Sequence, residues 1–170
     1  MPLRKERRLQ VGAGRAARRS KYTTLDANPK VAADYVAEVP PMPPELERNW
    51  WDAIEASHFL EHLYPWDAAQ FLQECYDLLR PGGVLELELP NLDQCAELWT
   101  QGDDRDRVMA FMGFYGRPNP RNTWQAHKWG YTAETLTDAL VEAGFERENI
   151  AVLLATKHRP ARDFRIEARK

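Results

Sequence analysis

The chain has 170 residues, of which 44% are hydrophobic and 29% charged, a composition typical of a soluble globular protein that forms a single domain over residues 1–170. Its apolar stretches are too short to span a bilayer, its first residues lack the apolar core of a signal peptide, and its two cysteines form no disulfide framework, so we expect a cytoplasmic protein without membrane contact. Both ends are basic and the middle is acidic, which argues against a general nucleic-acid binder.

Four short strands are predicted in the first third of the chain. The first runs from Arg8 to Gly12, the second covers residues 22–28, and the third covers residues 33–39. A proline-rich loop begins at Pro40, and residues 50–59 predict a fourth strand that runs into a turn.

The rest of the chain alternates helices and strands. A helix capped by Asp67 is predicted to stop at the sequence RPGG, and a fifth strand follows over residues 84–90. After a looser region, a second helix is expected to start at Thr132 and to end at Gly144. The last two strands, IAVLLAT and DFRIEAR, are close enough in sequence to form an antiparallel pair. This order predicts an open α/β sheet, in which ligands bind beyond the carboxyl ends of the strands.

The sequence Gly12-Ala13-Gly14 lies at the first of those strand ends. Ala17 completes the pattern G-x-G-x-x-A of a dinucleotide-binding loop, and glycine lets a ligand approach the backbone closely. Only residues 15–21 separate Gly14 from the second strand, which is too few for a full crossover helix. A standard dinucleotide fold therefore fits poorly, whereas the carboxylates of Asp26 and Glu38 at the next two strand ends still point to a binding site.

Six segments, in order, resemble a known family. LQVGAG, TTLDANP, DYVAEVPPMP, WDAIEASHFLEHL, FLQECYDLLRPGGVLELELPNL and EAGF resemble the motifs of class I S-adenosylmethionine-dependent methyltransferases, most closely the small methyltransferases of type 11. The resemblance covers about residues 8–156. It implies a Rossmann-like open sheet of about seven strands, mostly parallel with an antiparallel C-terminal hairpin, and a shortened first crossover.

The resemblance also implies a cofactor site for S-adenosylmethionine. Gly12, Ala13 and Gly14 would surround the methionine moiety, and Asp26 with its neighbour Ala27 would hold the ribose. The remaining contacts would come from Glu38 and Val39 beside the adenine, and from Ser57 and His58 at the end of the fourth strand. Gln10 stands where an acidic residue is often found and the third glycine is absent, so a catalytically inactive binding or assembly protein of the same fold is the alternative.

The segment His58-Phe59-Leu60-Glu61-His62 carries the pattern H-x-x-E-H. On a helix, His58 and His62 could share a zinc ion with Glu61 as a base, so a zinc hydrolase is a further alternative. A strand directly precedes His58 and no partner motif supplies further ligands, so we expect no metal here. We instead take His58, His62 and His127 as candidate catalytic residues, because a histidine can accept a proton from a hydroxyl or amine acceptor.

Residues 92–131 are the least family-like part of the chain and are expected to form a substrate-side cap. This region is rich in aromatic residues and contains Arg117, Arg121 and Lys128, which together could hold a sugar, a base or a phosphorylated acceptor. The alternative is a small helical cap whose aromatic residues pack on the sheet. The methyl acceptor itself is not identified by the sequence.

The shortened first crossover predicts that part of one sheet face lacks a covering helix. An exposed apolar face is unstable in water, so either the arm of residues 1–8 folds back over it or a second copy of the chain or another protein covers it. We expect the partner contact, because a short arm rich in arginine and lysine covers apolar surface poorly. Arg15, Arg18 and Arg19 would then border this contact.

Overall fold

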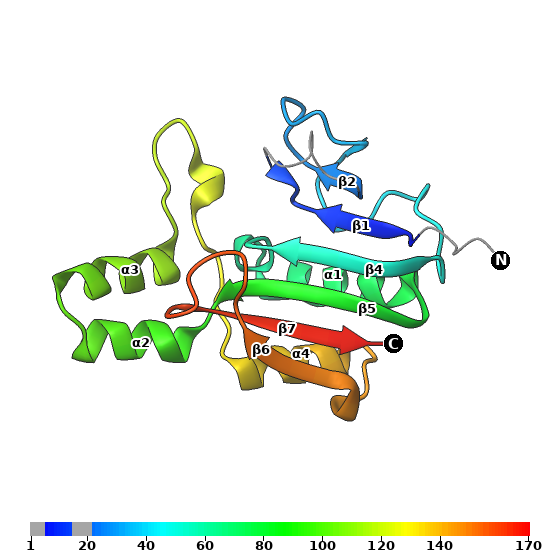
Figure 1. The fold of residues 1–170 in the computed structure, drawn as a ribbon. Coiled ribbons are helices and arrows are strands. Elements are labelled where there is room, and N and C mark those ends of the chain that lie inside the picture. Colours follow the sequence, from blue (N-terminus) through cyan, green and yellow to red (C-terminus); the bar gives the residue numbers. More distant parts are fainter. Residues whose placement is uncertain (1–5, 15–21) are drawn as a thin grey trace.

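A computed structural model describes residues 6–14 and 22–170 of the chain (Figure 1). The described residues form a seven-stranded sheet in the order β3-β2-β1-β4-β5-β7-β6. Its strands are β1 (Arg8–Val11), β2 (Thr23–Asp26), β3 (Tyr35–Val36), β4 (Trp51–Ser57), β5 (Leu79–Pro90), β6 (Ile150–Leu154) and β7 (Asp163–Arg169). The helices are α1 (Pro65–Leu78), α2 (Leu92–Gln101), α3 (Asp104–Tyr115) and α4 (Ala133–Glu142), and short 3-10 turns cover Leu60–His62, Thr123–Gln125 and Arg147–Asn149.

Strand pairing confirms the predicted open sheet. The strands β1 to β5 pair in parallel, whereas β7 is antiparallel to both β5 and β6. The chain between β1 and β2, with Arg15, Arg18 and Arg19, lies outside the described residues. The carboxyl ends of β1, β2, β3 and β4 therefore meet at one edge of the sheet, as the sequence predicts.

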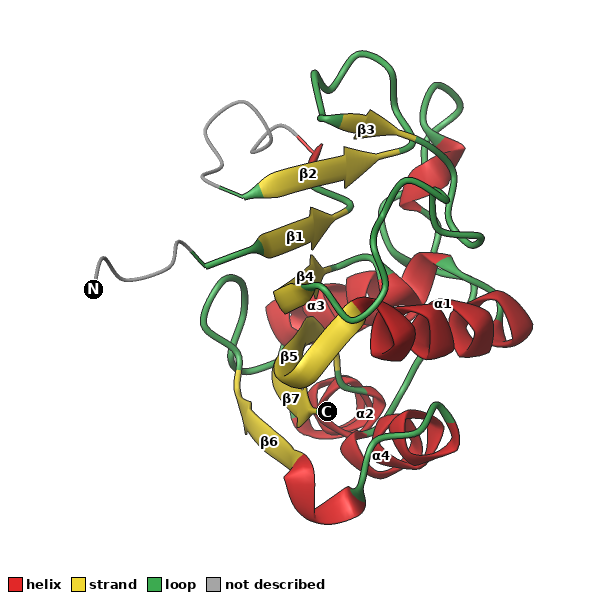
Figure 2. Cartoon of the chain, turned by 90° about the vertical axis from the view of Figure 1, so that its right-hand side faces the viewer, coloured by secondary structure: helices red, strands yellow, loops and turns green. Residues whose placement is uncertain are grey.

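The inner face of the sheet is apolar and is covered by helices. Successive strand residues point to opposite faces, and Leu9, Ile54, Leu85 and Ile166 all point inward with no exposed surface. In Figure 2, α1 and α4 lie on the same side of the sheet, where α1 contacts β5 and α4 contacts β7. Burial of this face by α1 and α4 forms the hydrophobic core.

The outer face of the sheet carries charged and polar side chains in its central strands. Glu86 on β5 lies 2.7 Å from Arg8 on β1 and 3.1 Å from Arg165 on β7. On the neighbouring strands, Gln10 donates a hydrogen bond of 3.2 Å to Glu55. The expectation of an apolar outer face is therefore wrong for the central strands, because the residues that alternate with the core positions are polar or charged and pair with one another.

Three local predictions differ from the structure. The helix α1 begins at Pro65 with Tyr64 as its N-cap rather than at Asp67, because proline is favoured at the first helical position, where no donor is needed. The sequence RPGG lies inside β5 as a bulge, since Leu79 pairs with Trp51 before the regular register resumes at Val84. The third strand keeps only two paired residues.

The region predicted to be loose contains two helices, α2 and α3, which lie beyond the carboxyl ends of the parallel strands (Figure 1). Asp103 caps α3 by accepting from the backbone of Asp106, whose side chain accepts from the backbone of Asp103 in return. The helix α3 buries only Ala110 and Gly113, so it lacks the apolar stripe that reveals most helices in a sequence. Within the described residues, no helix is long and apolar enough to cross a membrane.

Candidate functional site

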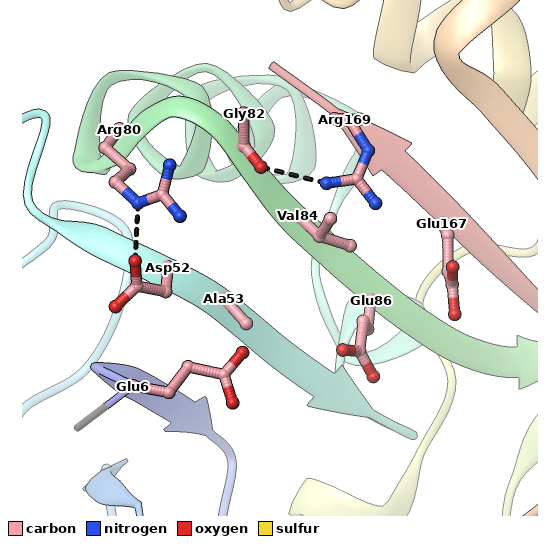
Figure 3. A pocket seen from close by; sticks show the side chains of 9 residues that line it. All are labelled: Glu6, Asp52, Ala53, Arg80, Gly82, Val84, Glu86, Glu167 and Arg169. Atoms are coloured by element: carbon pink, nitrogen blue, oxygen red, sulfur yellow. Dashed lines mark hydrogen bonds and ion pairs between the residues drawn. The ribbon is translucent and has the colours of Figure 1, made fainter. Parts of the chain in front are cut away.

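One cavity of about 530 Å³ lies on the outer face, far from the carboxyl ends of the parallel strands (Figure 3). Its walls come from the start of β4, the bulge of β5 and the end of β7. Asp52 pairs with Arg80, and Arg169 donates a hydrogen bond to the carbonyl oxygen of Gly82 (Figure 3). The cavity contains none of the predicted site residues, so its volume alone does not make it the functional site.

A second cavity, of about 310 Å³, opens at the carboxyl ends of β1, β2 and β3 and is called the strand-end cavity below. It is lined by five of the predicted cofactor residues, namely Gly12, Asp26, Ala27, Glu38 and Val39. Its volume is in the range of small-molecule sites. The structure thus places these five residues, which were predicted from their positions at strand ends, around one cavity.

The turn after β1 forms the floor of the strand-end cavity. Gly12 and Gly14 have positive φ angles of 66° and 53°, a conformation that favours glycine. The backbone N–H of Gly12 donates to the carbonyl of Leu25, and the N–H of Gly14 donates to Oδ2 of Asp26 at 2.8 Å. A Cβ atom on Gly12 would lie 2.8 Å from the ring of Phe59, so this glycine is required for packing as well as for its backbone angle.

Acidic side chains give the strand-end cavity its charge. Asp26, Glu38 and Asp67 line it, and Lys128 is the basic residue among its lining groups. Gln10 donates instead to Glu55 on the outer face and does not line the strand-end cavity. The replacement of the acidic residue of the family motif by Gln10 therefore changes no residue of the cavity lining. A cavity with three carboxylates suits a ligand that carries positive charge and hydroxyl groups.

Four of the predicted residues take other positions. Ala13 is buried in the turn, and neither Ala13 nor Gly14 lines the strand-end cavity. Ser57 ends β4 and His58 follows it directly, and both lie outside this lining. The backbone bends at His58, which has a positive φ of 49° that is unusual for a residue other than glycine. His58 therefore belongs to a different part of the site.

The third cavity, of about 410 Å³, contains all four histidines of the chain and is called the histidine cavity below. Its walls come from the turn after β4, the end of α3, the segment before α4 and the link between β6 and β7. Its lining residues are His58, His62, Met112, Gly116, Arg117, Gln125, His127, His158, Arg159 and Arg162. His62 lines both this cavity and the strand-end cavity, so the two cavities share one side chain.

His58 lies between two buried carboxylates. Its Nδ1 is 2.9 Å from Oε1 of Glu61, and its Nε2 is 3.2 Å from Oδ2 of Asp163. Burial disfavours the imidazolium, but the contacts with Asp163 and Glu61 outweigh burial and raise the pKa of His58 to about 9. His58 is therefore positively charged at neutral pH and cannot serve as a general base there.

Asp163 anchors this arrangement from the start of β7. Its carboxylate also accepts two hydrogen bonds from the guanidinium of Arg162 and one from the backbone of Arg159. Burial would raise the pKa of Asp163, but His58 and Arg162 together lower it below its ordinary value. Asp163 thus fixes the position of His58 and of the link that carries Arg159.

His62 and His127 each face a backbone carbonyl with one ring nitrogen. Nδ1 of His62 lies 3.0 Å from the carbonyl oxygen of Ala126, and Nδ1 of His127 lies 2.8 Å from that of Gly113. Burial lowers the pKa of His127 despite the nearby charge of Glu61. The two rings are 5.0 Å apart in an edge-on arrangement, so the structure brings these candidate catalytic residues together.

The zinc-hydrolase interpretation of H-x-x-E-H fails on geometry. Its two histidines must be one turn apart on the same face of a helix. Here only Leu60–His62 is helical, as a short 3-10 turn, and both ring nitrogens of His58 contact carboxylates. His58 and His62 therefore do not form the metal pair that this motif requires.

Most aromatic side chains of the predicted cap face solvent. Those of Trp99, Phe111, Tyr115, Trp124 and Trp129 are between 48% and 66% exposed, so they do not pack on the sheet as the helical-cap alternative supposed. Trp124 borders the strand-end cavity beside Lys128. The cap is helical, as that alternative expected, but its aromatic surface is available to ligands.

Sequence reasoning missed several residues of the two cavities. Phe59 and Trp124 line the strand-end cavity, whereas Asp163, His158 and Arg159 surround His58. The sequence contains a signal for Asp163, His158 and Arg159. The polar segment KHRPAR is followed directly by Asp163, which is the first residue of a predicted strand, so these polar side chains gather at one strand end. The sequence alone could not show that this hairpin link returns to the turn after β4.

Two comparisons with known proteins both identify methyltransferases as relatives of this chain. A model of the methyltransferase domain family matches residues 11–150. A protein of Mycolicibacterium smegmatis, named "Probable S-adenosylmethionine-dependent methyltransferase", is 34% identical over 98 residues, which are 58% of this chain and 30% of that relative. The chain thus matches less than a third of the length of this curated relative.

Solved structures share the fold at low sequence identity. A Thermotoga maritima methyltransferase, described as a possible histamine N-methyltransferase, has a TM-score of 0.67 at 16% identity, with 99% of this chain and 84% of that chain covered. Phosphoethanolamine N-methyltransferase 2 of Haemonchus contortus, solved in complex with S-adenosyl-L-methionine, has a TM-score of 0.61 at 14% identity, with 97% and 48% covered.

Proposed function

The chain belongs to the class I S-adenosylmethionine-dependent methyltransferase family, and from this premise we propose that it transfers a methyl group from S-adenosylmethionine in the strand-end cavity to an acceptor in the histidine cavity. The observation that carries the proposal is that His62 lines both cavities. Methyl transfer is an in-line displacement at a sulfonium, so donor and acceptor must meet at one point. The shared side chain marks such a point.

The strand-end cavity suits the cofactor of this family. Asp26 would accept hydrogen bonds from the ribose hydroxyls, and Glu38 would accept from the adenine amino group. The carboxylates of Asp26, Glu38 and Asp67 also complement the positive charge of the sulfonium and amino groups. The turn of Gly12, Ala13 and Gly14 would lie beside the methionine moiety, and Gly12 would contact it from the cavity lining.

The histidine cavity suits an acceptor with a negative charge. Arg117 and Arg159 line it, and neither guanidinium pairs with a carboxylate in the described part of the chain. Arg117 donates a hydrogen bond to the sulfur atom of Met112, and Arg159 donates one to the sulfur atom of Met109. Free guanidinium groups beside a charged His58 would bind a phosphate or a carboxylate of the acceptor.

The cap residues 92–131 would then act on the acceptor side. Arg117 and His127 reach the histidine cavity from this region, and Trp124 reaches the strand-end cavity. Since His58 is charged, His62 and His127 are the candidate catalytic residues with a ring nitrogen available to the acceptor. The two free, buried thiols Cys75 and Cys95 support a cytoplasmic location.

The test is formation of S-adenosylhomocysteine with matched acceptors. Phosphorylated and carboxylated alcohols and amines are compared with uncharged analogues. The enzymes are the wild type, R117A, R159A and the control R121A. Arg121 lies on the same loop as Arg117 but does not line the histidine cavity. Loss of one charge-assisted contact is expected to lower kcat/KM for charged acceptors about 10-fold or more in R117A and R159A but not in R121A. An equal loss in all three variants, or no product with any acceptor, would contradict the proposal.

A further inference from the structure

Three side chains form a compact group of metal-ligand types beside the shared residue His62. Glu61, His62 and His127 each offer one ligand atom, and these three atoms lie within 4.8 Å of one another. The group joins two distant segments, since the backbone N–H of Lys128 donates to the carbonyl of Glu61 at 2.8 Å. The fold therefore holds the group in place independently of any ligand.

Both histidines are oriented as metal ligands usually are. A carbonyl oxygen can only accept, so Nδ1 of His62 and Nδ1 of His127 must carry the proton in their contacts with Ala126 and Gly113. The lone pair of each neutral imidazole then resides on Nε2. Ligating histidines in metal sites commonly donate their other N–H to a backbone carbonyl, which fixes the tautomer and the ring orientation.

Glu61 supplies a buried carboxylate with spare acceptor capacity. Its residue is 1% exposed, and neither oxygen has a hydrogen bond of good geometry among the described residues. Oε1 lies 2.9 Å from Nδ1 of His58 and 4.0 Å from Nε2 of His127. A buried carboxylate is costly without a compensating cation or donors, and the contact with His58 leaves Oε2 unused.

We propose that Glu61, His62 and His127 bind a divalent transition-metal ion through one carboxylate oxygen and two Nε2 atoms. Two imidazoles with one carboxylate favour zinc or a similar first-row ion over magnesium or calcium, which prefer oxygen ligands. A tetrahedral zinc ion with bonds of about 2.1 Å holds its ligand atoms about 3.4 Å apart, so the group contracts by roughly 1 Å on binding. His58 is not a ligand of the ion, although its Nδ1 contacts the carboxylate of Glu61.

The position of this site gives the ion a role that rests on the proposed function. Because His62 lines both cavities, a bound ion lies where the cofactor and the acceptor meet. With three protein ligands, the ion has an open position for an acceptor oxygen, whose pKa it would lower. The ion would therefore replace a histidine as the group that activates the acceptor.

The test measures metal binding without cofactor or acceptor. The full chain is stripped with a chelator and titrated with Co²⁺, whose visible absorption reports its ligands, and Zn²⁺ affinity is measured by competition. H62N and H127N keep an amide N–H in place of Nδ1 but lose Nε2, and E61Q removes the charge. The control is H158N, because His158 lines the same cavity outside the metal group.

We expect one ion per chain in the wild type and in H158N. Loss of a ligand should weaken binding by at least about 100-fold in H62N, H127N and E61Q, since even outer partners of metal ligands contribute 10–100-fold. Thermal unfolding of the stripped variants checks that each is folded. Equal affinity of H127N and H158N, or no binding by the wild type, would overturn the metal site. Binding of S-adenosylmethionine by the stripped wild type is scored separately, so failure of the metal site and failure of the proposed function are distinguishable.

Discussion

The strand-end cavity and the histidine cavity share His62 but are built in different ways. The first is made mainly by short turns that directly follow β1, β2 and β3, so its residues occur in the sequence in the order of the strands. The second needs four segments that are distant in sequence, from the turn after β4 to the link before β7. A site whose residues follow consecutive strands can be predicted from the sequence, whereas a site built from segments that are distant in sequence cannot.

The two cavities also differ in charge. Carboxylates line the strand-end cavity, whereas arginines and histidines line the histidine cavity. This contrast suits a cationic donor on one side and an anionic acceptor on the other. Variants that disturb one cavity and spare the other therefore test whether the division is real.

The largest expected effect is on the stability of the histidine cavity. Asp163, whose side chain is fully buried, pairs with both His58 and Arg162, so D163A removes the carboxylate that these two largely buried cations share. Breaking a buried pair in this way should lower the free energy of unfolding by about 3–5 kcal/mol, measured by urea denaturation. The control R121A should change stability by less than about 0.5 kcal/mol, as exposed sites usually do. A loss below about 1 kcal/mol in D163A would show that Asp163 does not hold this cavity together.

A smaller effect is expected at Glu88, which fixes the link between β6 and β7. Its buried carboxylate accepts from the backbone N–H groups of Thr156, Lys157 and His158, at 2.9 to 3.0 Å. E88A should lower the free energy of unfolding by about 2–3 kcal/mol, because hydrogen bonds to a charged group are lost and buried donors remain. The same variant should weaken acceptor turnover but keep the affinity for S-adenosylmethionine. An equal loss of both would show that the two cavities are not independent.

The fold and most of the strand-end residues that line the strand-end cavity could be predicted because each step is local. Gly12 needs a positive φ, Asp26 ends β2 and Glu38 follows β3, and Thr132 caps α4 with Thr135 in a reciprocal pair. The start of α1 was misplaced because both Asp67 and Pro65 are good helix-start residues, and the sequence does not rank them. The helix α3 was missed because its buried residues, Ala110 and Gly113, are too small to form an apolar pattern.

The histidine cavity could be predicted only in part. His58, His62 and His127 were identified as candidates, but their roles depend on tertiary neighbours. Asp163 lies 105 positions after His58 in the chain and yet contacts it at 3.2 Å, and this contact makes His58 a cation rather than a base. The charged outer face is not evident from the sequence, because the register between strands decides which side chains share a face.

Calorimetric titration of the full chain with S-adenosylmethionine tests the central claim most directly. The wild type should bind one cofactor per chain, and D26A should bind about 10–100-fold more weakly, because it loses a charged acceptor worth about 1–3 kcal/mol. The control E97A removes an exposed carboxylate on α2 outside the strand-end cavity and should bind like the wild type. No binding by the folded wild type, or equal affinity of D26A and the wild type, would contradict the assignment of the strand-end cavity as the cofactor site.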